Sequence, residues 1–218
     1  MEWDWNFVLE ILPNLWDGVV ITIQAALLGS LVSMTLGLFL AIGRRSPNRW
    51  LALPVGYVSE FVRGTPLLVQ LYFLFYVLPD FGVLLSPLTA GVVGLGVHYS
   101  TYTAEVYRTG IDNLPRGQWE AAKAVNLKPR QTWVYVIIPQ AIPPMIPPLA
   151  NYFVAMFKET PLLSAITVLE LMNQARSVAN FSYRYLEPMT LVGVFFLLVS
   201  IPAVYGLRYL ENRYAPRP

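Results

Sequence analysis

The sequence has 218 residues, of which 56% are hydrophobic and only 13% are charged, and its mean hydropathy is +0.50. Soluble domains usually carry about 25% charged residues, so this composition indicates a membrane protein. The absence of cysteine excludes disulfides and thiolate metal sites, and a single histidine excludes a histidine-rich metal site. A net charge of +2 without a basic patch gives no support for a nucleic-acid partner.

The first membrane span is expected to follow an acidic N-terminal stretch. Residues 1–17 contain acidic residues but no Lys or Arg, and residues 19–42 form an uncharged run of 24 positions. Such a run covers a hydrocarbon core of about 30 Å with some tilt, which places the first span at residues 19–43.

The next apolar interval, residues 51–79, is expected to form the second span. Glu60, Arg63 and a Gly-Thr-Pro breaker at residues 64–66 interrupt it.

Three further spans are expected, at about residues 86–110, 140–157 and 188–207. The fourth span contains four prolines, Pro143, Pro144, Pro147 and Pro148. Each proline removes a backbone donor, and in a membrane the freed carbonyls must meet protein, water or ligand. The cluster therefore predicts either a broken helix beside a water-filled path or a bent packing helix. The expected fold is all-α, with about five transmembrane helices in one polytopic domain.

The distribution of Lys and Arg predicts the orientation of these spans. With the N-terminus outside and the C-terminus cytoplasmic, the cytoplasmic basic residues are Arg44, Arg45, Arg49, Arg108, Arg116, Lys123, Lys128, Arg130, Arg208, Arg213 and Arg217. Only Lys158, Arg176 and Arg184 then lie outside, and Arg63 is left unassigned. This orientation puts the long polar interval at residues 111–139 in the cytoplasm.

That polar interval is expected to form two short helices. Pro115 suits the first turn of the first helix, because its missing N–H would have no partner there and its φ is preset. The helix should end near Asn126, since Asn tolerates the left-handed conformation that terminates helices. Pro129 opens a second helix by the same logic. We therefore expect a compact pair of helices between two membrane spans.

The same interval resembles a known element of a transporter family. Residues 118–122 (QWEAA) and 137–141 (IIPQA) resemble the cytoplasmic EAA loop of permease subunits of bacterial ABC importers. The resemblance implies a single transmembrane permease domain over residues 1–218, with a coupling loop at 111–139 that docks into a groove on an ATPase subunit. The coupling residues it implies are Gly117, Glu120, Ala121, Ala122, Asn126 and Pro139. The family pattern has Gly where this chain has Asn126, and both residues accept the left-handed turn. The alternative is an ordinary amphipathic loop helix.

The resemblance also implies partners that supply energy and solute. The sequence has no Gly-rich Lys-Ser/Thr loop for nucleotide phosphates, so we expect a transport subunit rather than an enzyme. No cofactor is expected in this chain, and ATP with Mg would be bound by two cytoplasmic ATPase subunits. A second permease, identical or related, and an extracytoplasmic solute-binding protein would complete the importer. Its location would be the bacterial cytoplasmic (inner) membrane, in contact with the lipid bilayer.

Other segments resemble one group within that family. Residues 61–70 (FVRGTPLLVQ) resemble the polar amino acid uptake type, and residues 67–76, 98–105 and 157–170 resemble permeases for ectoine and hydroxyectoine. These solutes are compact zwitterions, which an Arg or Lys, a carboxylate and aromatic faces would suit. The substrate-path candidates are Arg63, Tyr99, Tyr102, Lys158, Glu159 and Thr160. Arg63 pairing with Glu60, and tyrosines in the interfacial aromatic belt, are the structural alternatives.

A rival function needs no ATPase. An ion-coupled carrier or small channel would use Glu105 and His98, which lie within the third predicted span, as a proton relay. Against this, a lone His in a packed helix is more often a hydrogen-bonded structural residue, and Glu105 is spaced to pair with Arg108. Uptake set by pH rather than by ATP would distinguish this rival from an importer.

Overall fold

The computed structural model describes residues 3–214, and its regular elements are all helical, which confirms the all-α fold. They are α1 (Trp5–Arg44), α2 (Arg49–Gly64), α3 (Leu67–Tyr72), the π-helix η1 (Phe73–Val77), the 3₁₀ helix η2 (Leu78–Phe81), α4 (Pro87–Asp112), α5 (Arg116–Ala124), α6 (Pro129–Gln131), the π-helix η3 (Thr132–Ile137), α7 (Ile138–Glu159), the 3₁₀ helix η4 (Thr160–Ile166), α8 (Leu171–Ser182) and α9 (Leu186–Tyr214).

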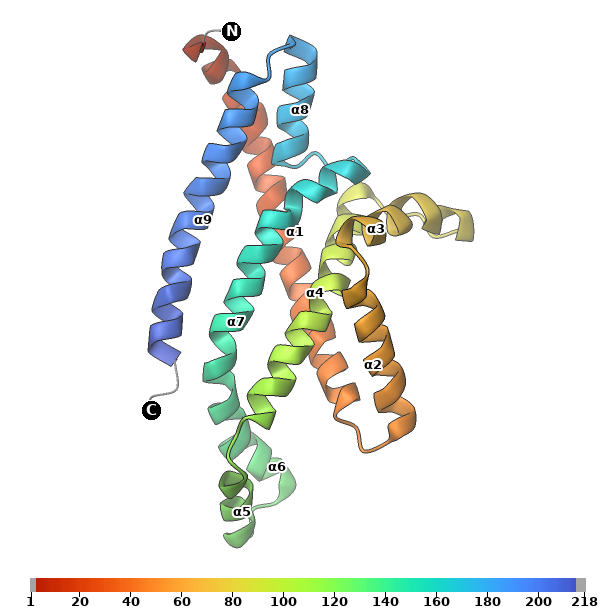
Figure 1. Ribbon diagram of the computed structural model, residues 1–218, viewed down its shortest axis with the longest axis vertical. Helices are drawn as coiled ribbons and strands as arrows, with labels where there is room; N and C mark the ends of the chain where they lie inside the picture. Colours follow the sequence, from red (N-terminus) through yellow and green to blue (C-terminus); the bar gives the residue numbers. More distant parts are fainter. Residues whose placement is uncertain (1–2, 215–218) are drawn as a thin grey trace.

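The long helices form an elongated bundle around α1 (Figure 1). Helices α1 and α4 run side by side in the same direction, α7 runs back between α4 and α9, and α2 lies on the far side of α4. Among residues 3–214, three helical segments are long and apolar enough to cross a membrane: Trp5–Arg44, Pro129–Ile166 and Leu186–Tyr214. The bent pair formed by α2 and the segment after it would make a fourth. The five predicted spans and the orientation of the termini stay predictions.

Helix α1 begins at Trp5, whereas the first predicted span begins at residue 19, so the helix is longer than the span. It has 40 residues, or about 60 Å at about 1.5 Å per residue, twice a hydrocarbon core of about 30 Å. Asp4 starts the helix because its carboxylate accepts hydrogen bonds from the N–H groups of Asn6 (2.9 Å) and Phe7 (3.3 Å). The N-terminal part of α1 therefore extends beyond the apolar run.

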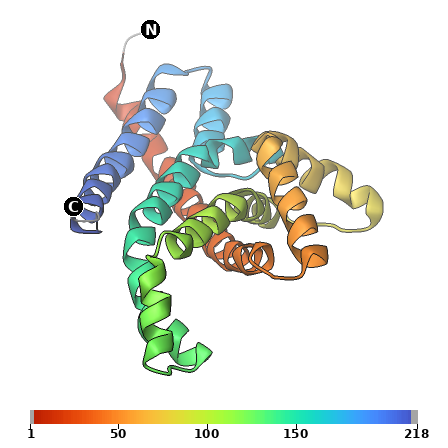
Figure 2. The same ribbon diagram turned by 60° about the horizontal axis from the view of Figure 1, so that its bottom comes forward.

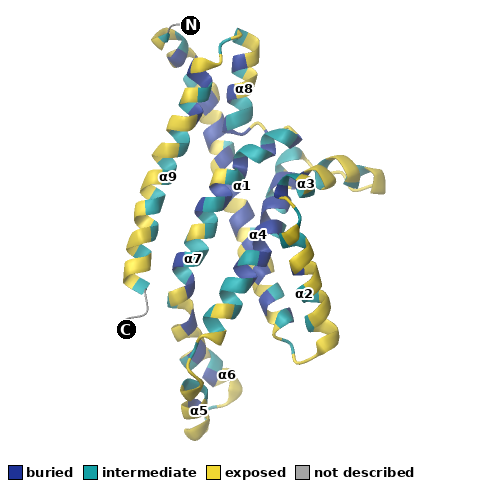
Figure 3. Ribbon diagram, in the orientation of Figure 1, coloured by how far each residue is buried: buried dark blue, intermediate teal, exposed yellow. Residues whose placement is uncertain are grey.

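Small residues allow α1 and α4 to pack closely. A Cβ atom added at Gly29 would lie 3.0 Å from Met156 Sδ and 3.2 Å from Leu95 Cβ, and one added at Gly37 would overlap Thr103 Oγ1. The Thr103 hydroxyl in turn donates to the Ser33 carbonyl oxygen (2.9 Å). The buried residues follow this contact, whereas the outward faces of α2 and α9 are exposed and apolar (Figure 3). Such a pattern is expected where lipid covers the outside of a bundle.

The second predicted span is broken. Helix α2 and residues 67–81 meet at an angle of 102° at Thr65 and Pro66, so residues 51–79 do not form one straight crossing. Pro66 cannot continue the helix, and Gln70 takes up the freed carbonyl oxygens. Its Nε2 donates to the carbonyl oxygens of Val62 (2.7 Å) and Thr65 (3.1 Å). The break predicted from the Gly-Thr-Pro sequence is confirmed.

The fourth predicted span continues further than expected. Helix α7 passes through its four prolines without interruption, and the helical segment runs from Pro129 to Ile166. Met156 accepts a hydrogen bond from Ser30 Oγ (3.5 Å), which puts it at the level of the middle of the first predicted span. The helical segment thus continues past residue 157, the predicted end of the span, and Lys158 and Glu159 lie within one turn of the level of Ser30 in α1.

A second core joins α8 to the start of α1. Ile11, Leu15 and Val19 of α1 pack with Leu171 and Ala175 of α8. Leu171 N donates to Thr22 Oγ1 (3.1 Å), and a Cβ atom at Gly18 would lie 2.7 Å from Leu171 Cα. Between η4 and α9, α8 and its short connections form this part of the chain.

The buried carboxylate of Glu170 caps α8. Its oxygens accept the N–H groups of Met172 and Asn173, both at 2.8 Å, and the side chain is fully buried. Burial raises the pKa of this carboxyl from 4.5 to about 7, although these N–H groups and Arg176 act in the opposite direction.

The Gly37→Ala variant should lower the stability of the protein. The new methyl group has no room, because Thr103 is held by its hydrogen bonds and the Ser100 carbonyl oxygen would lie only 3.0 Å away. We expect a loss of about 1–3 kcal/mol and a lower unfolding temperature in detergent. Gly193→Ala is the control, because nothing lies within 4 Å of its added Cβ and helix propensity favours Ala by up to about 1 kcal/mol. Equal unfolding temperatures for the two variants would contradict the close α1–α4 contact.

The stability of the protein should fall between about pH 4.5 and 7 because of Glu170. A carboxyl whose pKa is raised in the folded state favours folding at low pH, and this contribution, about 3 kcal/mol, is lost as the pH rises through the folded pKa. Glu170→Gln should flatten the unfolding temperature across that window. Glu211→Gln, at an exposed position, should keep the wild-type slope. An unchanged slope in Glu170→Gln would show that Glu170 is not the titrating group.

Candidate functional site

The coupling loop (residues 111–139) projects beyond the ends of α4 and α7, at the bottom of Figure 1 and toward the viewer in Figure 2. Helix α5 follows Pro115, and α6 begins at Pro129, as the two prolines predicted. The prediction that the second helix is short was wrong, because α6 continues through η3 into α7. Asn126 has a φ of 57° between them, so the predicted left-handed turn is confirmed. Leu127 N donates to the Ala122 carbonyl oxygen (3.0 Å) across this turn.

Side chains hold the two arms of the loop together. The rings of Trp119 and Trp133 meet edge to face with centroids 5.2 Å apart. Gln140 Nε2 donates to Gln118 Oε1 (3.0 Å), which joins α5 to the start of α7. The loop is therefore a packed unit with fixed geometry.

The predicted coupling residues differ in exposure. Gly117, Glu120, Ala121, Asn126 and Pro139 are exposed. Ala122 is only 3% exposed and is buried within the loop itself. The structure thus explains the small side chain of Ala122 by packing inside this chain, and leaves Ala121 open to a partner.

A second set of candidates meets between α4 and α7. His98, Tyr99 and Tyr102 of α4 and Tyr152 of α7 form an aromatic cluster, in which the ring centroids of neighbours lie 5.4–6.2 Å apart. Sequence analysis missed Tyr152. Its spacing of seven residues from Glu159 puts both side chains on one face of α7, and this signal was present in the sequence.

Arg63 of α2 reaches the aromatic cluster from the side. Its guanidinium carbon lies 5.5 Å from the centroid of the Tyr102 ring, and Nη2 donates to the Thr101 carbonyl oxygen (3.2 Å). Within residues 3–214 no ion pair joins Arg63 to Glu60, so the alternative of a Glu60–Arg63 pair was wrong. Arg63 instead faces the helix that carries the tyrosines.

Three buried polar atoms around this cluster lack hydrogen-bond partners among residues 3–214. They are Arg63 Nε, His98 Nδ1 and Glu159 Oε2. Glu159 lies close enough to His98 and Tyr99 to interact electrostatically with both. Buried polar atoms usually have hydrogen-bond partners. Unpaired atoms on a cationic side chain, Arg63, and an acidic one, Glu159, therefore identify a candidate binding site for a polar ligand.

The other two substrate-path candidates lie elsewhere. Thr160 is fully buried, and its hydroxyl donates to the Phe157 carbonyl oxygen (2.7 Å) of its own helical segment. Lys158 is exposed and lies with Tyr205 and Arg208 of α9 in a depression on the opposite side of α7. The structure therefore joins Arg63, Tyr99, Tyr102 and Glu159, and separates Lys158 from them.

A cavity of about 370 Å³ leads from the aromatic cluster toward the coupling loop. Tyr102 and Tyr152 line one end, and Asn113 and Leu114 line the other. Pro144 and Pro148 also line it, and the Pro144 carbonyl oxygen lacks a helical donor because Pro148 has no N–H. Helix α7 is not broken, so the broken-helix alternative was wrong, although the freed carbonyl oxygen lies beside a cavity.

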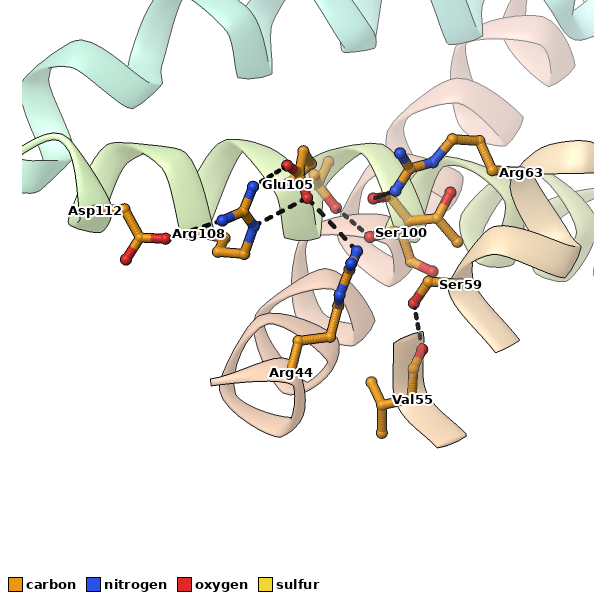
Figure 4. A network of polar contacts seen from close by, with 10 residues as sticks. Arg44, Val55, Ser59, Arg63, Ser100, Glu105, Arg108 and Asp112 are labelled. Carbon is orange, nitrogen blue, oxygen red and sulfur yellow. Dashed lines mark hydrogen bonds and ion pairs between the residues drawn. The ribbon is translucent and has the colours of Figure 1, made fainter. Parts of the chain in front are cut away.

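Ion pairs tie the end of α1 to the end of α4 (Figure 4), and one of their members, Glu105, also lines this cavity. Glu105 accepts from Arg108 Nε (3.2 Å) and pairs with Arg44 (3.6 Å). Asp112 pairs with Arg108 (3.0 Å) and with Arg45. The predicted pair of Glu105 with Arg108 is confirmed, whereas the contributions of Arg44 and Arg45 were missed because they come from another helix.

The proton-relay rival gains no support from these positions. His98 and Glu105 are seven residues apart on α4, a separation of about 10 Å along the helix. Glu105 is already engaged by two arginines.

Comparisons with known proteins agree on one family. Residues 33–216 match the family described as "Binding-protein-dependent transport system inner membrane component". The chain belongs to this permease family. It is 44% identical, over 94% of this chain and 89% of the relative, to a probable amino-acid ABC transporter permease, y4tG, of Sinorhizobium fredii. It is 35% identical, over 98% of both chains, to the glutamine transport system permease GlnP of Escherichia coli.

A solved structure supports the same assignment. A chain of a crystal structure described as an amino acid ABC transporter with histidines superposes with a TM-score of 0.90 at 33% identity. The alignment covers 98% of this chain and 100% of that chain. This chain is therefore a permease subunit of a binding-protein-dependent transport system, without ATPase activity of its own, and the relatives are named for amino acids and glutamine. The family implies ATPase subunits and a binding protein, and the apolar helices agree with an inner-membrane location.

The two adjacent alanines of the coupling loop should respond differently to enlargement. Ala121→Leu places the larger side chain on the surface, so the protein should keep its unfolding temperature but lose most ATP-dependent uptake. Ala122→Leu inserts three extra carbons into a packed site and should lower the unfolding temperature, with a cost of about 1–3 kcal/mol. Uptake into proteoliposomes and melting in detergent measure the two effects. Full uptake by Ala121→Leu would contradict a coupling role for that surface.

Proposed function

We propose that this permease moves a compact zwitterion along a path lined by Arg63, the aromatic cluster and Glu159. The observation that carries this proposal is that side chains of opposite charge, Arg63 and Glu159, both border the aromatic cluster without being paired with each other. Arg63 Nε and Glu159 Oε2 are buried and lack partners among the described residues, and the rings lie at the side of both groups. A guanidinium suits a carboxylate, and a carboxylate with aromatic faces suits an ammonium or amidinium group.

The depth of these groups favours a transport role over a structural one. Ser30 and Gly29 of α1 contact Met156, three residues before Glu159, near the middle of the first predicted span. Ionisable groups at such depth are costly and usually face a partner or a water-filled path. The cavity beside Tyr102 and Tyr152 supplies such a path toward the coupling loop.

We propose a chemical class of solute, compact zwitterions, rather than a single compound. Ectoine, hydroxyectoine and polar amino acids all combine a carboxylate with a cationic group, and the sequence resemblance favours the first two. The relatives are named for amino acids and glutamine, and the similar crystal structure contains histidines. In such importers a separate binding protein would set much of the specificity.

Energy would reach the path through the coupling loop. We propose that Glu120, Ala121 and the exposed turn at Asn126 dock on a cytoplasmic ATPase that binds ATP and Mg. Two ATPase subunits would hold the loops of two permeases, identical or related, and their closure would draw the loops together. This motion couples to solute only if docking contacts differ between the two states of the ATPase.

The charge pair is tested by neutralising each member. Arg63→Met and Glu159→Gln should each reduce uptake of ectoine or glutamine by about tenfold to a hundredfold, because each removes a charge-assisted hydrogen bond in a buried site. Lys158→Met is the matched control, since Lys158 is adjacent in sequence but lies on the α9 side. Uptake is measured in proteoliposomes with the ATPase and binding protein, with competition by ectoine, glutamine and an uncharged analogue.

Two outcomes would contradict the proposal. Wild-type uptake by Arg63→Met and Glu159→Gln would remove the charge pair from the path. Uptake that continues without ATPase and follows pH would favour the ion-coupled rival instead.

A further inference from the structure

The helices α1, α8 and α9 together form an outer module at one end of the bundle. We define it as Asp4 and residues 5–18 of α1, all of α8, and residues 183–188 (Figure 1). The part of α1 before residue 19 adds about 20 Å of helix beyond the first predicted span. The outer module is therefore placed outside the hydrocarbon region, at the end opposite the coupling loop.

The outer module is held rigidly. Glu187 is 1% exposed; its Oε1 accepts from Asp4 N (3.2 Å) and also pairs with Arg184. Arg184 pairs in addition with Asp4 (3.2 Å), and its guanidinium carbon lies 5.0 Å from the centroid of the Phe7 ring. These contacts fix the start of α1 to the connection between α8 and α9. A surface carried by such a unit is preorganised, which reduces the entropic cost of binding.

One face of the outer module is a groove between α1 and α8. Its volume is about 610 Å³. Phe7, Ile11 and Val178 supply apolar lining, and Glu10, Asn14 and Gln174 supply polar lining. The Glu10 carboxylate is exposed and has no ion pair within the described part of the chain. The groove therefore offers an apolar contact beside an acidic group that a Lys or Arg would complement.

Two aromatic side chains stand at the end of this groove. Phe181, which lines it, is 91% exposed, and Tyr183 is 84% exposed. Tyr183 also has a φ of 54°, a left-handed conformation that is strained for a bulky residue. Large exposed aromatics on a rigid turn outside the membrane are typical anchors of a protein interface.

We propose that this groove, with Phe181 and Tyr183, is the surface on which the solute-binding protein docks. The proposal rests on the proposed function and on the predicted outer position of the N-terminus. The occupant is a water-soluble protein that presents a Lys or Arg to Glu10 and apolar side chains to the aromatic pair. Anionic lipid headgroups fit this groove poorly, because Glu10 is the one charged residue among those that line it.

The test measures how the binding protein encoded with this permease stimulates ATP hydrolysis by the reconstituted importer. Phe181→Ala, Tyr183→Gly and Glu10→Lys should each raise the concentration for half-maximal stimulation at least tenfold, with unchanged basal hydrolysis. Tyr183→Gly removes the ring and also relieves the positive φ, so misfolding does not explain its effect. Trp50→Ala, at an 89% exposed position near the other end, and Glu211→Lys are the matched controls and should behave as wild type.

A labelling experiment on Tyr183→Cys provides the second readout. The natural chain has no cysteine, so a membrane-impermeant maleimide would report this position alone. We expect labelling from the outside of intact cells, and protection when the binding protein is added to the reconstituted importer. Labelling from the cytoplasmic side only would overturn the inference, as would a disulfide between two permease copies together with normal stimulation.

The outcomes separate this inference from the proposed function. If the wild type is stimulated and the three variants match it, the docking surface is wrong and the importer function stands. If the binding protein does not stimulate the wild type at all, the proposed function fails and the docking surface fails with it.

Discussion

The close contact between α1 and α4 fixes the relative heights of the polar groups on these two helices. Gly29 and Gly37 let the two helices meet without intervening side chains, and the Ser33–Thr103 hydrogen bonds fix their register. At the lower end the same register aligns Arg44 and Arg45 with Glu105 and Asp112. A shift of one turn would separate those ion pairs, so packing and electrostatics select the same arrangement.

This register explains why charged groups are tolerated in an apolar chain. Met156 packs on Gly29, so Glu159 and Lys158 of the same helix lie near the middle of the first predicted span of α1. Glu159 then faces the tyrosines and His98 of α4, while Lys158 turns toward α9. Lys158 and Glu159 are neighbours in the sequence but have different surroundings. Of the two, only Glu159 lies in the group of side chains that includes Arg63.

The sequence predicted local features well and long-range ones poorly. Pro115, Asn126 and Pro129 fix the coupling loop through their own backbone preferences, and Pro66 fixes the break after α2 in the same way. Hydropathy indicates which residues can lie in a membrane, but it does not indicate where a helix begins or ends. The ends of α1 and of the α7 segment were therefore misplaced. The start of α1, for example, is stabilised by packing against α8. The ring contacts of Tyr152 and the Arg44–Glu105 pair depend on register between helices, which no single segment encodes.

The path from the coupling loop to the aromatic cluster is one continuous helical segment. Trp133 and Gln140 anchor the loop to residues that lead without a break into α7, through Tyr152 and on to Glu159. Helix α4, which forms the other wall of the cavity, also runs into the loop, but close packing and ion pairs hold its lower half to α1. Under the proposed function, displacement of the loop would therefore move the lower part of α7 relative to α4 and change the cavity between Pro148 and Tyr102. A packed loop joined to a continuous helix suits such a role better than a flexible linker, which would absorb the displacement.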